Sequence, residues 1–191
     1  MVQTYRTNNT TLFGDMLDAA KVGNDSAWKS LYQGLAGPVT GYLASRDAKD
    51  PEDLAGEVFL QVARDIHRFE GDETSFRSWV YVIAHRRLID ARRAETRRPK
   101  LAESFDVSSD DLPGGDVEIE AINKLALTKL HEILDALTEN QRDVLALRVV
   151  ADLSLEETAK VMGKRVGAIK AVQRRALLAL RDQIEQGRVT L

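Results

Sequence analysis

Residues 154–180, SLEETAKVMGKRVGAIKAVQRRALLAL, decide how the C-terminal part of this 191-residue chain folds. Ser154 followed three positions later by Glu157 is a capping box, which predicts the start of a helix. Gly163 is a natural residue to end that helix, because glycine adopts the left-handed conformation without strain. A longer helix is expected from about residue 166 to 186. Two helices joined by a short glycine-containing turn are typical of a helix-turn-helix.

The longer helix is predicted to have two different faces. At about 100° per residue, one sector collects apolar side chains, namely Ile169, Val172, Ala176, Leu180 and Ile184. The opposite sector carries small residues and cations, namely Gly167, Lys170, Ala171 and Arg174. Small side chains permit close approach to a major groove, while Lys and Arg can reach guanine edges or phosphates. An amphipathic helix packed in a bundle is the alternative interpretation.

Further upstream, the composition predicts two separate domains. Thr138 and Gln141 form a second capping box, and apolar residues from Ile119 to Leu137 recur at helical spacing. The stretch 104–116, SFDVSSDDLPGGD, has instead the composition of a linker. We therefore expect an all-α chain with an N-terminal domain at 12–99, a flexible acidic linker at 100–118 and a helix-turn-helix domain at 119–186.

The N-terminal domain is also predicted to be helical. Asp50-Pro51-Glu52-Asp53 is a strong helix start, with a capping side chain, a proline in the first turn and acids near the positive end of the helix dipole. A second helix is expected from Thr74 or Ser75, with an apolar stripe of Phe76, Trp79, Val80, Ile83, Ala84 and Leu88. Residues 12–45 predict one or two more helices, whose core candidates are Leu17, Trp28, Leu31, Leu35 and Leu43.

Charge is distributed unevenly, although the net charge is only −3. A basic cluster at 86–100 is followed by an acidic stretch at 101–120 and a second basic cluster at 164–181. Solvated helix faces are the plainest interpretation of any one cluster. The first cluster follows the aromatic residues Phe76, Trp79 and Tyr81, and aromatic stacking beside cations is the chemistry of single-strand binding. Phe76 and Trp79 can alternatively belong to the core.

Several other classes of protein are not expected. The chain has no cysteine, which excludes disulfides and thiolate zinc sites and permits a cytosolic protein. No apolar run is long enough to span a bilayer, and the N-terminus lacks a signal-peptide core. His67, His85 and His131 lack metal-ligand spacing, and no glycine-rich phosphate loop is present. We therefore expect no enzyme activity, no metal and no cofactor.

Three ordered motifs carry a specific resemblance. The stretch 50–60, DPEDLAGEVFL, resembles the polymerase-binding helix of extracytoplasmic-function (ECF) sigma factors. The stretch 76–93, FRSWVYVIAHRRLIDARR, resembles their promoter-melting and −10-recognising helix. The stretch from Leu137 to Arg181 resembles their −35-recognising domain. The resemblance covers about residues 12–184, in the family's order and with the linker in the family's position.

This resemblance implies a role for each set of residues. Polymerase binding would fall to Asp53, Leu54, Glu57, Val58, Phe59 and Gln61. Contacts to the −10 region would fall to Trp79, Arg86, Arg87, Arg92, Arg93 and Arg97. Contacts to the −35 element would fall to Arg165, Val166, Lys170, Ala171, Arg174 and Arg175. The implied partners are core RNA polymerase (its clamp helices and flap region), promoter DNA and an anti-sigma factor, with no membrane insertion.

Two rival functions stay open on the sequence alone. An ordinary helix-turn-helix regulator would bind duplex DNA without polymerase. A polymerase-binding adaptor would need no specific DNA contact. The arginine-rich helix at 76–98 argues against the first rival, because a regulator that binds only duplex DNA has no evident use for it.

Overall fold

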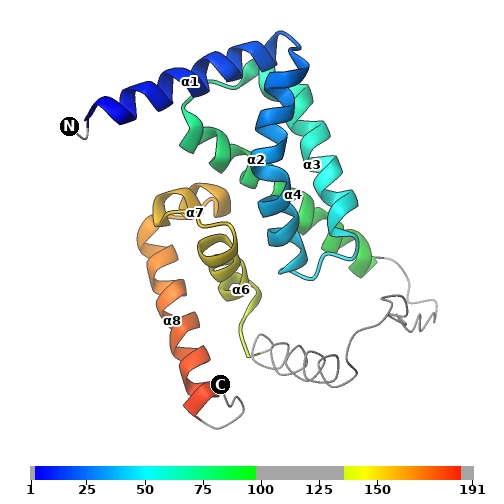
Figure 1. Ribbon diagram of the computed structural model, residues 1–191. Coiled ribbons are helices and arrows are strands. Elements are labelled where there is room, and N and C mark those ends of the chain that lie inside the picture. The colour runs from blue at the N-terminus through cyan, green and yellow to red at the C-terminus, as the bar shows by residue number, and fades with distance from the viewer. Residues whose placement is uncertain (1–2, 98–135, 186–191) are drawn as a thin grey trace, which may run out of the picture.

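The computed structural model describes residues 3–97 and 136–185, and every regular element within these two ranges is helical (Figure 1). The N-terminal range contains α1 (Gln3–Lys21), α2 (Asp25–Ala44), α3 (Pro51–Asp65), a 3-10 turn (Ile66–Arg68) and α4 (Glu73–Arg97). The C-terminal range contains α6 (Glu139–Leu145), a π-helical turn (Ala146–Val150), α7 (Leu155–Met162) and α8 (Val166–Glu185). The all-α prediction is confirmed. The predicted linker, and most of the helix predicted before Leu137, lie outside the described residues.

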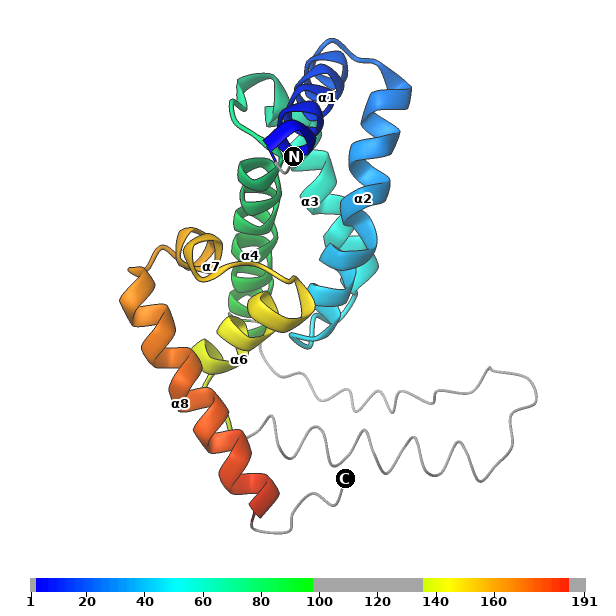
Figure 2. The ribbon, with the colours of Figure 1, turned by 60° about the vertical axis from the view of Figure 1, so that its left-hand side comes forward.

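The N-terminal helices form a bundle in which α2, α3 and α4 pack together and α1 lies across one end (Figures 1 and 2). Its core contains the predicted residues Leu17, Leu31 and Leu43, while Trp28 and Leu35 are half-buried at its margin. Burial of these apolar side chains is the main force that holds the helices together. The bundle fixes the direction in which α3 and α4 present their outer faces.

The starts of α3 and α4 differ in detail from the prediction. Pro51 occupies the first turn of α3, but the Asp50 side chain forms no capping hydrogen bond, because the Asp50 backbone (φ −129°, ψ 80°) departs from the usual N-cap geometry. Helix α4 begins at Glu73, one or two residues earlier than the expected start at Thr74 or Ser75. There the Ser75 N–H donates to Asp72 Oδ1 at 2.8 Å. Hydrogen bonds from Ser75 hold the pKa of the Asp72 carboxyl below its ordinary value.

The C-terminal helices begin and end where the capping rules place them. The Glu157 N–H donates to Ser154 Oγ at 3.1 Å, and the Ser154 N–H donates to Glu157 Oε2 at 2.7 Å, which completes the capping box. Thr138 and Gln141 form the same reciprocal pair at the start of α6. Gly163 ends α7 with a φ of +61°, a left-handed conformation that favours glycine.

The two ranges share one hydrophobic core, which no local pattern predicted. Leu147, Leu153 and Val161 from the C-terminal range are buried in the same cluster as Tyr42 and Val80 from the bundle. Helix α4 packs against α7, and α2 packs against the π-helical turn (Figure 2). The described helices therefore form a single closed body, in which the helix-turn-helix rests on the bundle.

We predict that Ser154→Ala lowers the free energy of unfolding by about 1 kcal/mol, because it leaves an N–H at the start of α7 without its cap. Urea unfolding monitored by far-UV circular dichroism measures this loss. Ser30→Ala is the matched control, because the exposed Ser30 hydroxyl only donates to the Ser26 carbonyl within α2. Equal loss in both variants would contradict the capping role of Ser154.

Candidate nucleic-acid interface

Helix α8 presents the cationic face that its sequence predicted. The six predicted −35 residues are all exposed: Arg165, Val166, Lys170, Ala171, Arg174 and Arg175. On the opposite face, Ile169 and Ala176 are buried, and Val172 and Leu180 are half-buried. Ile184 is exposed instead of buried, because α8 extends beyond α6 at this end (Figure 1). Among the described residues, Lys170 and Arg174 form no ion pair, so both remain available to a ligand.

The orientation of α8 is fixed by a small core within the helix-turn-helix. Ile169 packs with Val144 of α6 and Ala159 of α7 in a buried cluster. At the turn between α7 and α8, Lys164 Nζ donates to Asn140 Oδ1 at 2.7 Å, which ties the turn to α6. A helix held by two neighbours presents its outer face in one defined direction, as groove recognition requires.

The predicted −10 arginines of α4 fall into three different surroundings. Arg86, Arg93 and Arg97 are exposed. Arg87 instead contacts α3, where Nη1 lies 3.5 Å from Glu57 Oε2 and Nη2 donates to Gln61 Oε1 at 3.2 Å. Arg92 contacts acidic side chains of α6, as described below. One arginine-rich motif thus supplies exposed cations, of which Arg93 lies 3.8 Å from Asp90 on the same helix, and cations that contact other helices.

The aromatic side chains at the start of α4 belong mainly to the core. Phe76 and Tyr81 are buried, which contradicts the hypothesis that they stack on bases. Burial raises the pKa of Tyr81 to about 12. Trp79 is half-buried and stacks on Phe69, with ring centroids 5.0 Å apart and planes 29° apart. Trp79 is therefore the one residue of the three that is partly exposed.

Helix α3 carries an acidic surface above buried apolar residues. Asp53 and Glu57 are exposed, and Leu54 and Gln61 are half-buried. The resemblance assigned Val58 and Phe59 to the same surface, but both side chains lie in the core. There the Phe59 ring packs edge-on against Tyr32, with ring centroids 4.8 Å apart. A groove of about 380 Å³ separates α3 from the end of α4, and its lining includes Asp50, Asp53, Leu54, Glu57, Arg92 and Glu95.

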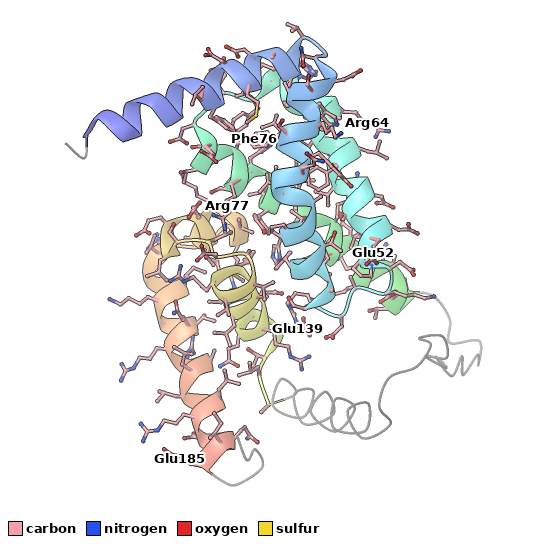
Figure 3. The ribbon with its side chains drawn as sticks, in the orientation of Figure 1. Glu52, Arg64, Phe76, Arg77, Glu139 and Glu185 are labelled. Atoms are coloured by element: carbon pink, nitrogen blue, oxygen red, sulfur yellow. The ribbon has the colours of Figure 1, made fainter. Side chains whose placement is uncertain are left out.

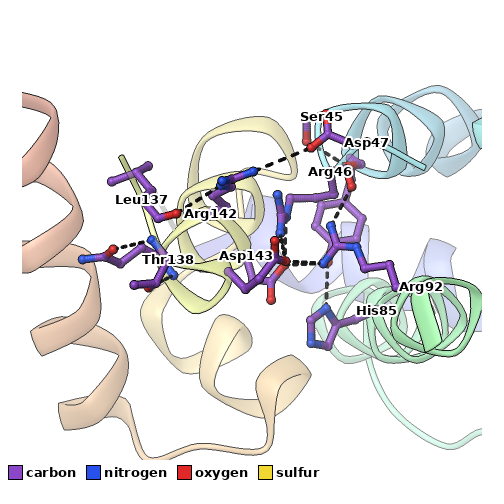
Figure 4. Close-up of polar contacts among 12 residues, drawn as sticks. Ser45, Arg46, Asp47, His85, Arg92, Leu137, Thr138, Arg142 and Asp143 are labelled. Atoms are coloured by element: carbon purple, nitrogen blue, oxygen red, sulfur yellow. Dashed lines mark hydrogen bonds and ion pairs between the residues drawn. The ribbon is translucent and has the colours of Figure 1, made fainter. Parts of the chain in front are cut away.

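A buried polar network, which was not predicted from the sequence, joins the two ranges (Figure 4). Arg46, in the turn after α2, donates from Nε to Asp143 Oδ1 at 2.8 Å and from Nη2 to Glu139 Oε2 at 2.8 Å. Arg92 Nη1 donates to the same Glu139 oxygen at 2.7 Å. Neither Arg46 nor Asp143 belongs to a local motif, so pattern analysis had no signal that could have identified them.

Close by, Tyr42 and His85 share a hydrogen bond of 2.9 Å between the tyrosine hydroxyl and His85 Nδ1. Burial lowers the pKa of His85 and raises that of Tyr42, so both groups favour their neutral forms. In the part of the chain that the structure describes, no three His, Cys, Asp or Glu side chains are grouped as metal ligands. None of the helices in this part is long and apolar enough to cross a membrane.

The structure combines a helical bundle that carries exposed arginines on α4 with a helix-turn-helix that packs on this bundle. This combination defines the class of protein. Two family models match the chain: Sigma-70 region 2 over residues 28–98 and Sigma-70, region 4 over residues 133–182. The ECF RNA polymerase sigma factor SigD of Mycobacterium tuberculosis is 33% identical over 187 residues, an alignment that covers 91% of this chain and 86% of SigD. The ECF sigma factor ShbA of Streptomyces griseus is 32% identical over 193 residues, covering 95% of this chain and all of ShbA.

Two solved structures share the fold. CnrH, in complex with the cytosolic domain of CnrY, has a TM-score of 0.66 at 19% identity, covering 90% of this chain and 96% of CnrH. RpoE of Bartonella quintana, in complex with the anti-sigma factor NepR, has a TM-score of 0.63 at 17% identity, covering 82% and 96%. The chain belongs to the ECF family of RNA polymerase sigma factors. Its function is to direct transcription initiation to promoters.

The buried position of Phe59 generates a prediction. Phe59→Ala is expected to lower the free energy of unfolding by about 3–5 kcal/mol, because it opens a cavity in the bundle. The adjacent Leu60→Ala is the control, since Leu60 is 60% exposed. Chemical unfolding of both variants measures the difference. If Phe59→Ala had the same free energy of unfolding as the wild type, the assignment of Phe59 to the core would be wrong.

Proposed function

We propose that this sigma factor divides its work among three helices: α3 docks on core polymerase, α4 contacts the −10 region and α8 contacts the −35 element. The observation that carries the proposal is the face of α8, where exposed Lys170 and Arg174 lie opposite the buried Ile169. The other two assignments extend the same analysis of exposed faces to α3 and α4.

For α8, the proposed ligand is duplex DNA. Lys170 and Arg174 are four residues apart, so they project from adjacent turns of one helix face. The small Gly167 and Ala171 on the same face allow the helix backbone to approach the bases. A bidentate cation–guanine pair supplies about 1–3 kcal/mol of discrimination against a wrong base. Arg165 and Arg175, beside this face, are placed to contact phosphates.

For α4, the proposed ligand is the −10 region. Arg86, Arg93 and Arg97 are exposed along the helix and can follow a phosphate backbone. Trp79 is partly exposed near the start of the helix. Arg87 is assigned a positioning role, because its contacts to Glu57 and Gln61 link α4 to α3. Through this link, the −10 surface and the polymerase surface share one rigid support.

For α3, the proposed ligand is the clamp-helix region of the polymerase's largest subunit. Exposed Asp53 and Glu57 lie one turn apart beside half-buried Leu54, which gives an acidic surface with an apolar centre. Half-buried Gln61 lies one turn further along the helix. Val58 and Phe59 support that surface from below instead of contacting the partner. The flap region is a proposed second contact, made by the C-terminal helices.

Two further assignments rest on relatives. The solved structures of RpoE and of CnrH were each determined with a bound partner, an anti-sigma factor in the case of RpoE. We infer that this chain also has an anti-sigma partner. This sigma factor would act in the cytoplasm, where core polymerase and promoter DNA are found. We propose no catalytic activity for it.

Lys170→Ala and Arg174→Ala should each reduce transcription from a promoter with an intact −35 element by about 5- to 150-fold, which corresponds to about 1–3 kcal/mol. Run-off transcription with core polymerase on matched promoters, with and without the −35 element, measures the loss. Lys29→Ala removes the same charge from exposed α2 and serves as the control. Unchanged −35 dependence in both α8 variants would refute the recognition face.

Asp53→Arg and Glu57→Arg should weaken binding to core polymerase, because each reverses an exposed charge on the proposed docking surface. Pull-down with tagged core polymerase measures the binding, and far-UV circular dichroism shows whether the fold is kept. Asp15→Arg is the control, since Asp15 is exposed on α1, away from this surface. Wild-type binding by both α3 variants would rule out α3 as the docking helix.

A further inference from the structure

One threonine of α4 lies among the arginines of the first basic cluster. Thr96 is the only hydroxyl-bearing residue between Arg86 and Arg97. The single acid within four positions of it is Glu95, whereas the cations within the same distance are Arg92, Arg93, Arg97, Arg98 and Lys100. Helix α4 ends at the edge of the described part of the molecule, and side chains of its last turn project from the surface (Figure 3). Every residue from Arg93 to Arg97 is exposed, so the Thr96 side chain is accessible to an enzyme.

Thr96 and two arginines share one face of α4. Residues three and four positions apart are neighbours on a helix surface, and Thr96 follows Arg93 by three positions and Arg92 by four. The Thr96 hydroxyl donates to the Arg92 carbonyl at 2.9 Å. All three residues line an open groove of about 770 Å³, whose other lining residues are Ile89, Glu95, Arg97, Glu139, Asn140 and Asp143. A group attached to Thr96 would therefore lie beside guanidinium groups.

The arginines near Thr96 differ in how many of their donors are already used. Arg92 donates from Nη1 to Glu139 at 2.7 Å. Arg93 Nη1 lies 3.8 Å from Asp90, a distance too long for a hydrogen bond, and the Arg93 side chain is 67% exposed. Arg97 uses only its Nε, which donates to the Arg93 carbonyl at 3.2 Å. Arg93 and Arg97 therefore retain donors that can bind a phosphate group.

The other exposed threonine of α4 has the opposite surroundings. Thr74 lies in the first turn of the helix, and the single cation within four positions of it is Arg77. The acids within the same distance are Glu70, Asp72 and Glu73. A phosphate beside arginines gains charge-assisted hydrogen bonds, whereas a phosphate beside carboxylates is repelled. Thr74 thus serves as an internal reference for Thr96, because it has the same side chain on the same helix with acids around it.

We propose that Thr96 is a phosphorylation site for an ATP-dependent serine/threonine kinase, and that the phosphate weakens the contacts of α4 with the −10 region. This inference rests on the function proposed above for Arg93 and Arg97. In the reaction, Thr96 Oγ1 forms a bond to the γ-phosphorus of ATP while the bond from that phosphorus to the β,γ-bridging oxygen breaks. ADP leaves, and the hydroxyl proton passes to a base of the kinase. The arginines around Thr96 select a kinase whose substrate cleft is acidic.

The location of Thr96 in the last turn of α4 suits both the reaction and its effect. Helix ends open at little cost, so the hydroxyl can leave the Arg92 carbonyl and enter a kinase cleft. Phosphothreonine carries a charge of about −1.5 to −2 at pH 7 and three strong acceptor oxygens. These oxygens pair with Arg93 and Arg97 through the same N–H donors that bind DNA phosphates. The modified helix therefore has fewer cations to offer to the −10 region.

Mass spectrometry of the full-length protein purified from its native host tests the modification. Cleavage after glutamate is suitable, because it gives one peptide from Thr96 to Glu103 and another that begins at Thr74. The first peptide should be found with one added phosphate, and Thr74 should be unmodified. Absence of phosphate from Thr96 in exponential growth, in stationary phase and under stress would overturn the site. Equal phosphorylation of Thr74 would also overturn it, because the arginines would then not select the position.

Run-off transcription with core polymerase tests the effect of the phosphate. Full-length protein with phosphothreonine at position 96, inserted during translation by an expanded genetic code, should lose −10-dependent transcription several-fold. Thr96→Glu should lose less, because it adds a single charge. Phosphothreonine at position 74 and Thr96→Val should both transcribe at the wild-type level. Far-UV circular dichroism should stay close to that of the wild type, and Thr96→Glu decides should the phosphorylated protein fail to fold.

Arg93→Gln separates failure of this inference from failure of the proposed function. If α4 contacts the −10 region, Arg93→Gln alone lowers −10-dependent transcription, and phosphothreonine at position 96 has a smaller effect in this variant than in the wild type. Wild-type transcription by the phosphorylated protein, together with impaired transcription by Arg93→Gln, would overturn the effect of the phosphate alone. Wild-type transcription by both Arg93→Gln and Arg97→Gln would instead refute the role proposed for α4.

Discussion

The arrangement of the described helices depends on how one guanidinium is kept out of water. Arginine stays charged at any physiological pH, so burial of Arg46 requires a fixed supply of negative partners. Its neighbours on α2 and α3 do not provide them, and α6 does. A buried ion pair contributes little net stability compared with an apolar pair of the same shape, but removal of one partner is strongly unfavourable. The pair therefore selects this arrangement of the helices more than it strengthens it.

The sequence predicted most local structure because local structure is set by neighbouring residues. Capping side chains determined where α6 and α7 begin, and Gly163 determined where α7 ends. Apolar spacing correctly oriented α8 at Ile169, with Lys170 on the outside. The contact between the bundle and the helix-turn-helix follows no such rule. Arg46 and Asp143 are 97 positions apart, and the sequence around Asp143 does not indicate that Arg46 is its partner.

The errors in the candidate sites share one cause. A resemblance to a helical motif identifies a stretch of chain, whereas a binding surface occupies only one face of the helix. Successive residues point about 100° apart, so a continuous stretch always includes core positions. Val58 and Phe59 on α3, and Tyr81 on α4, were such positions. Sequence periodicity alone could have assigned Val58 to the core, because it belongs to the apolar spacing that also contains Leu54 and Val62.

The π-helical turn Ala146–Val150 changes the direction, around the helix axis, in which the side chains after it point. Its closing hydrogen bond runs from the Ala151 N–H to the Ala146 carbonyl, so the turn holds one residue more than an α-helical turn. Without that residue, everything after Val150 would be rotated by about 100° relative to α6. Asp143 could then face Arg46, or Leu153 could enter the core, but not both. The single extra residue thus allows one continuous segment to place both the Asp143 carboxylate and the Leu153 side chain against the bundle.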